Sequence, residues 1–204
     1  MAGTRVYIEQ GERWVFAVCL DWPGWCRRAR SADAALVALG SYRERYERIV
    51  ESDLGPTTFD VLDTLTGNTT TDFGAPSRIW PGDEAGLDDA AIARHLGLLG
   101  RNWAYLDAVA RRSPSTLMKG PRGGGRDRDA VLDHVREAER TYCANVGRRV
   151  APRTVWSEQR AAVLDALRRG SSGPWPAPYA IRRIAWHVTD HAWEIEDRSP
   201  QSTH

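Results

Sequence analysis

Two histidines near the C-terminus, His187 and His191, stand four residues apart. If this segment is helical, both imidazoles lie on one face, about 6 Å apart along the helix axis, which a single metal ion can bridge. A third imidazole would complete a site that leaves a divalent ion its full charge and one open position. Such a metal lowers the pKa of a bound water or thiol toward neutrality, so this spacing indicates a catalytic rather than a structural metal.

The third ligand has to come from elsewhere in the chain. His134 is the first choice, because it lies beside the apolar positions Val131 and Val135, which point it toward the interior of a helical bundle. His95 is the second choice, and His204 lies at an unanchored terminus. A histidine on a bundle helix is commonly a core residue, so the spacing alone leaves a purely structural interpretation open.

Acidic residues follow two of these histidines at helical spacing. Glu137 comes three residues after His134, and Glu194 comes three residues after His191. Either carboxylate could accept a hydrogen bond from an imidazole or complete the coordination. Glu137, Asp190 and Glu194 are therefore the candidates for a general acid or base, and solvated surface charges are the alternative interpretation.

Long apolar periods of about 3.6 residues dominate the chain from residue 87 onward. They predict four helices, at 88–111, 129–146, 155–169 and 179–197. A connection rich in Gly, Pro and Arg at 113–128 is long enough to cross from one end of a bundle to the other. We expect an antiparallel four-helix bundle over 87–198, followed by a flexible tail at 199–204.

The first 80 residues show a different pattern. Short segments rich in β-branched and aromatic residues predict strands at 6–8, 14–20 and 57–65, and an amphipathic pattern predicts one helix at 32–51. Gly11 lies in a plausible hairpin turn between the first two strands. The sequence thus predicts an α+β chain, with a small N-terminal β-β-α(-β) unit over 1–80 ahead of the C-terminal antiparallel four-helix bundle.

The overall charge does not point to a nucleic acid. The 204 residues include 28 basic and 27 acidic side chains, for a formal net charge of +1. Non-specific nucleic-acid binders use a net positive field, so we do not expect a nucleic-acid partner. The sequence feature that favours one is the group Arg122, Arg126 and Arg128 in the glycine-rich connection.

The cysteines and the apolar segments indicate in which cellular compartment the protein is found. Cys19, Cys26 and Cys143 are odd in number and widely spaced, which indicates neither a disulfide framework nor a cysteine zinc site. No run approaches the roughly 20 apolar residues that span a bilayer, and no basic segment followed by an apolar one marks a signal peptide. We therefore expect a cytoplasmic protein with no membrane partner.

The residues around the histidines resemble a known family. His134 in DHVREAERTYCANVG, followed by the pair in IRRIAWHVTDHAWEIEDR, is similar to the DinB superfamily, the DinB/YfiT-like four-helix-bundle metalloenzymes. The resemblance covers residues 87–198 and implies a three-histidine metal site at His134, His187 and His191, with zinc or nickel as the divalent transition metal.

Family members include S-transferases and isomerases that use mycothiol, bacillithiol or glutathione. The resemblance thus implies a metal-dependent enzyme, a thiol transferase or a related hydrolase or isomerase, with a low-molecular-weight thiol as cosubstrate and a small-molecule substrate. The composition, with 27 arginines and one lysine, is similar to that of actinobacterial proteins, which favours mycothiol.

The N-terminal unit is similar to HicB-like domains in the segment RWVFAVCLDWPGWCRRARSADAALVALGSYRERY. HicB proteins are antitoxins that bind a toxin and often DNA. The alternative to an enzyme is therefore a non-enzymatic regulatory or protein-interaction module, with this unit as the partner-binding part and the bundle as a scaffold. A packing role or a homodimer interface is a further interpretation of the same unit.

Overall fold

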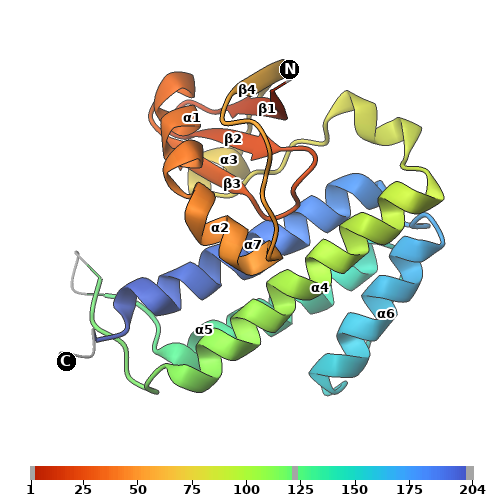
Figure 1. Cartoon of the computed structure of the whole chain (residues 1–204). Coiled ribbons are helices and arrows are strands. Elements are labelled where there is room, and N and C mark those ends of the chain that lie inside the picture. The colour runs from red at the N-terminus through yellow and green to blue at the C-terminus, as the bar shows by residue number, and fades with distance from the viewer. Residues whose placement is uncertain (1–2, 121–123, 201–204) are drawn as a thin grey trace.

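The fold was analysed in a computed structural model that describes residues 3–120 and 124–200 (Figure 1). The described residues form four strands, seven α-helices and one short 3-10 helix. In chain order these are β1 (Thr4–Gln10), β2 (Val15–Cys19), β3 (Cys26–Ala29), α1 (Ala32–Ser41), α2 (Arg43–Val50), β4 (Phe59–Thr66), α3 (Thr69–Phe73), η1 (Pro81–Ala85), α4 (Asp89–Arg112), α5 (Arg128–Asn145), α6 (Trp156–Arg168) and α7 (Ala177–Arg198). Arg122, His204 and most of the tail predicted at 199–204 lie outside the described residues.

The strands form one mixed sheet in the order β3-β2-β1-β4. β1 and β2 make the predicted hairpin, in which the Gly11 amide donates to the Trp14 carbonyl over 2.9 Å. β4 returns beside β1 in parallel, after α1 and α2 have crossed one face of the sheet. β3 was not predicted, because its four residues include Arg27 and Arg28 and have no alternation of apolar and polar side chains.

Both faces of the sheet are covered. Along β1, Val6 and Ile8 pack in one apolar cluster with residues of α1 and α2, whereas Tyr7 packs in another with Trp186 of α7. This split follows from the two-residue period of a strand. Phe16 of β2 meets Trp186 edge to face, with ring centroids 6.1 Å apart. One face of the sheet is therefore covered by α1 and α2, and the other meets Trp186 of α7, while Trp193 of the same helix packs into the cluster of α1 and α2.

The single helix predicted at 32–51 is wrong, because the chain forms two helices there. Ser31 caps α1 by accepting from the Ala34 amide, and α1 ends before Tyr42, whose φ of −96° and ψ of 4° leave the helical region. The bend places the Tyr42 ring 4.9 Å from the Trp193 ring of α7. α2 then packs against α4. The helical period of the sequence continues across this bend, so periodicity alone did not reveal it.

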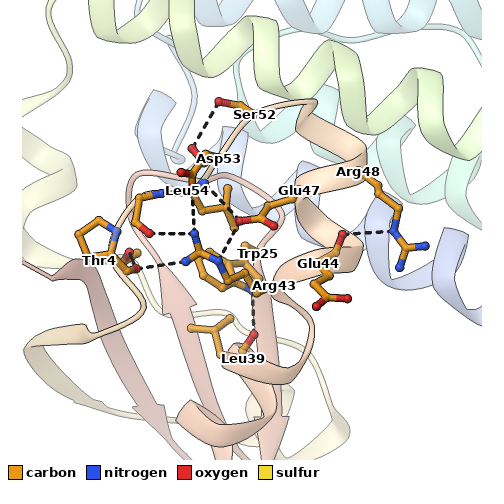
Figure 2. Close-up of polar contacts among 12 residues, drawn as sticks. Thr4, Trp25, Leu39, Arg43, Glu44, Glu47, Arg48, Ser52, Asp53 and Leu54 are labelled. Carbon is orange, nitrogen blue, oxygen red and sulfur yellow. Dashed lines mark hydrogen bonds and ion pairs between the residues drawn. The ribbon is translucent and has the colours of Figure 1, made fainter.

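Arg43, the first residue of α2, fixes the connection into β4 (Figure 2). Its guanidinium pairs with Glu47 at 2.8 Å and with Asp53 at 2.9 Å. It also donates to the carbonyl oxygens of Gly55 at 2.8 Å and Pro56 at 3.2 Å. These contacts satisfy backbone carbonyls in an irregular segment that would otherwise need water.

The C-terminal half consists of four long helices within one or two residues of the predicted bounds. α7 contacts α4, α5 and α6, and α6 also contacts α4 and α5. The side chains between them form one apolar cluster, which includes Leu99, Leu106, Val135, Ile181 and Ile184. Within the described part of the chain, no helix combines the length and the apolar character that crossing a bilayer requires.

Candidate metal centre

Three histidines from two helices meet at one point. His134 lies on α5, and His187 and His191 lie one turn apart on α7. Each offers a ring nitrogen, and these three atoms lie within 4.8 Å of one another. The Nε2 atoms of His134 and His187 are 3.3 Å apart. Within the described residues, no cysteine or carboxylate belongs to this group, so its potential ligands are imidazoles alone.

The apolar pattern of α5 and α7 explains why the three histidines lie close together. On α7, Ile184, Val188 and Ile195 are completely buried and turn the helix toward the core. On α5, the completely buried Val135 does the same directly after His134. The histidines follow at the edge of these apolar stripes, where α5 and α7 pack together. His134 and His191 are therefore partly accessible beside the core, with 14% of the His191 side chain exposed, whereas His187 is buried.

A carboxylate orients one of the imidazoles. Glu194 Oε2 lies 2.8 Å from His191 Nδ1, and Glu194 Oε1 lies 2.8 Å from Arg198. An ionised carboxylate only accepts hydrogen bonds, so His191 Nδ1 carries the hydrogen and Nε2 keeps its lone pair. The hydrogen bond from His191 is the main cause that lowers the pKa of Glu194. His187 differs, because its Nδ1 is buried without a hydrogen-bond partner among the described residues.

Burial favours the neutral form of two of the imidazoles, those of His134 and His187. Burial lowers the pKa of His187 well below its usual value, and the neighbouring His191 and Arg183 lower it further. Burial also lowers the pKa of His134, and His191 adds to the effect. A metal ligand must offer a free lone pair, so neutral rings favour metal binding near neutral pH.

Two of the donors have the separation expected at a tetrahedral transition metal. Ligand bonds of about 2.0–2.1 Å place two nitrogens of a tetrahedral zinc site about 3.3–3.4 Å apart. The 3.3 Å between His134 Nε2 and His187 Nε2 matches this separation and is long for an N–H···N hydrogen bond. Imidazole donors suit zinc, nickel, copper and iron, so these residues fit the class of ion but do not select the metal.

The three candidate acids or bases have different surroundings. Glu194 contacts His191 as described, whereas Glu137 is 62% exposed and pairs with Arg140. That contact lowers the pKa of Glu137 and engages its carboxylate away from the histidine group. Asp190 pairs with Arg27 of β3 at 3.1 Å. The acid–base role expected for Glu137 stays a prediction that no contact with an imidazole supports.

His95, the second choice for the third ligand, lies outside the group. It is buried on α4, and burial lowers the pKa of its imidazole to about 4, with smaller contributions from Arg94 and Arg182. Its Nδ1 has no hydrogen-bond partner among the described residues. His95 is thus a neutral core histidine, which is the structural interpretation that the sequence left open for every histidine.

Sequence reasoning missed an arginine and two aromatic residues beside the site. Arg183 precedes His187 by one turn on α7, and its guanidinium lies over the rings of Trp186 and Tyr142. The Tyr142 ring stands edge-on to His187 at 5.7 Å. The spacing of four residues between Arg183 and His187 was a readable signal, because it matches the spacing of the two histidines.

Comparisons with protein-family models, with curated proteins and with solved structures found no match to this chain. A function for the protein therefore has to be argued from the site itself. The central observation is the convergence of His134, His187 and His191, together with the carboxylate that orients His191.

Proposed function

We propose that this protein is a metal-dependent enzyme of the DinB-like type that uses a small thiol. In this proposal α4–α7 form the four-helix bundle of that superfamily, and His134, His187 and His191 hold a divalent transition metal, zinc or nickel. The supporting observation is a group of three imidazoles whose ring nitrogens lie within 4.8 Å, with no carboxylate or thiol in the set. Three neutral ligands leave the ion its positive charge, which suits activation of a bound nucleophile.

In this proposal the three histidines bind the metal, and Glu194 orients one of them. When bound, the metal supplies Lewis acidity that lowers the pKa of a coordinated thiol or water. His134 and His187 present neutral rings because burial disfavours their charged forms. Glu194 accepts the Nδ1 hydrogen of His191 and so leaves the lone pair on Nε2 free to bind a metal.

The thiol has to be a cosubstrate, because the chain's own cysteines are unsuited to the reaction. Cys19, Cys26 and Cys143 are all buried and free. Burial raises the pKa of Cys19 to about 12 and that of Cys143 to about 11, and it also raises the pKa of Cys26. The thiolate is the reactive form, so none of these groups supplies a nucleophile near neutral pH.

Elemental analysis of protein purified without a histidine tag tests the metal assignment. We expect about one equivalent of zinc or nickel in the wild type and its loss in the His187→Ala/His191→Ala double variant. His95→Gln is the matched control, since it removes a histidine outside the group and should retain the metal. Circular dichroism would establish that each variant is folded. A wild type that takes up no metal after reconstitution would refute the proposal and favour the interaction-module alternative.

A further inference from the structure

Arg183 carries a charge that the protein does not neutralise. The residue is half-buried on α7, its Nη1 is buried without a hydrogen-bond partner, and no described carboxylate lies within ion-pair distance of its guanidinium. Its neighbour Arg182 shows the usual arrangement, because it is buried and pairs with Asp83 at 2.5 Å. Placing a cation partly out of water without a partner costs free energy. An arginine left in this state is therefore suited to an anion from outside the chain.

Aromatic rings cover this arginine and join it to the histidine group. The guanidinium carbon lies 4.7 Å from the Trp186 ring centroid and 5.6 Å from that of Tyr142. Tyr142 contacts the edge of His187, and Trp186 also lies beside that ring, with centroids 6.1 Å apart. Rings over a guanidinium leave its in-plane N–H groups as the positions where a ligand can bind, and the edge formed by Nε and Nη2 is the one that is not buried as Nη1 is.

We propose that Arg183 binds the carboxylate of a small organic acid that is the substrate of the histidine-bound metal. This inference rests on the proposed function and adds the chemical class of the substrate. A carboxylate is planar and presents two oxygens, which match the parallel N–H groups of a guanidinium. The rings of Trp186 and Tyr142 supply apolar contacts for the carbon skeleton next to that carboxylate.

The helix also sets where the anchored carboxylate would lie. Arg183 and His187 are separated by one turn of α7, or about 6 Å along the axis, so both side chains leave the same face of the helix. Trp186 and Tyr142, which lie beside the guanidinium, also lie beside His187. We therefore infer an acid whose carboxylate is held by Arg183, so that the anchored end positions the reacting end near the histidine group.

Calorimetric titration with benzoate tests this subsite without any turnover. Benzamide is the matched neutral probe, because it has a similar shape and lacks the charge. In the zinc-loaded protein, we expect Arg183→Gln to weaken benzoate binding by about tenfold or more, since a charge-assisted pair is lost, and to leave benzamide binding unchanged. Arg183→Lys should restore only part of the affinity, because an ammonium keeps the charge but not the planar pair of donors.

The controls separate this inference from the proposed function. Arg168→Gln removes an exposed arginine at the end of α6 and should leave benzoate binding unchanged. Equal benzoate affinity in folded Arg183→Gln and wild type would overturn the inference, whether or not zinc is bound. The zinc content of the same samples reports on the proposed function. The metal-free protein is titrated in parallel, so benzoate binding that depends on Arg183 can be detected even if the metal assignment fails.

Discussion

His191 is the only one of the three clustered imidazoles for which a described carboxylate contacts the second ring nitrogen. Glu194 is itself held by Arg198, so the charge that orients His191 has a fixed position. Carboxylates in this position raise the basicity of a ligating imidazole and fix its tautomer. These contacts support a positioning role for Glu194, and the acid–base role expected from the sequence stays a prediction.

Glu194→Gln should weaken zinc binding by about 10- to 100-fold, because a neutral amide is a poorer acceptor for the Nδ1 hydrogen of His191. Competition with a chromogenic chelator measures the affinity directly. Glu137→Gln is the matched control on α5, since Glu137 is exposed and pairs with Arg140. Equal losses in the two variants would contradict the positioning role and indicate a general effect of surface charge.

For single residues, the sequence predicted which histidines cluster but not what surrounds them. The four-residue spacing of His187 and His191 and the apolar neighbours of His134 were sufficient to predict the group that the structure brings together. Glu137 and Glu194 stand at identical spacing from their histidines, so spacing could not separate them. Their difference depends on the direction of each side chain and on the nearest arginine, which are tertiary properties.

At the scale of the secondary-structure elements, the connection between α2 and β4 is held by one side chain rather than by backbone hydrogen bonds of a helix or strand. Residues 51–58 contain no helix or strand, yet Arg43 binds a carboxylate and two carbonyl oxygens within that segment. This connection leads into β4, the strand that closes the sheet beside β1. The position of an edge strand thus depends on a residue at the start of a helix.

Arg43→Lys should lower the free energy of unfolding by about 1–2 kcal/mol, because one ammonium cannot reproduce the several donors of the guanidinium. Arg48→Lys is the control on the same helix, since Arg48 donates only to the Glu44 carbonyl (Figure 2). We expect a change within about 0.5 kcal/mol for that variant. Urea unfolding curves measure both values, and an equally stable Arg43→Lys protein would show that the connection is held by other contacts.

Long helices and strands were predicted more accurately from the sequence than short ones. The four long helices after residue 87 and the β1–β2 hairpin were predicted from periodicity and turn residues. β3, α3 and η1 were missed because each has only four or five residues, too few to show a period. The break at Tyr42 was missed because the helical period of the sequence continues across it, and the Trp193 ring that packs on Tyr42 is distant in sequence.

At the scale of the whole molecule, α7 carries two histidines of the candidate site and also contributes side chains to the apolar clusters of both the sheet and the long helices. One side carries His187 and His191, while Trp186 and Trp193 pack into the clusters formed by the sheet and its helices. Arg27 of β3 also reaches Asp190 on the same helix. The two predicted parts, 1–80 and 87–198, share apolar contacts along α7, and their division into separate domains stays a prediction.

The most direct measurement is X-ray absorption at the zinc edge of the reconstituted protein, with and without an added small thiol such as 2-mercaptoethanol. We predict three imidazole nitrogens at about 2.0–2.1 Å in both samples and a new sulfur at about 2.3 Å when the thiol is present. The His187→Ala/His191→Ala variant should show neither shell. A zinc site with fewer than three imidazoles, or one that gains no sulfur from the thiol, would contradict the assignment of His134, His187 and His191 as a thiol-activating metal centre.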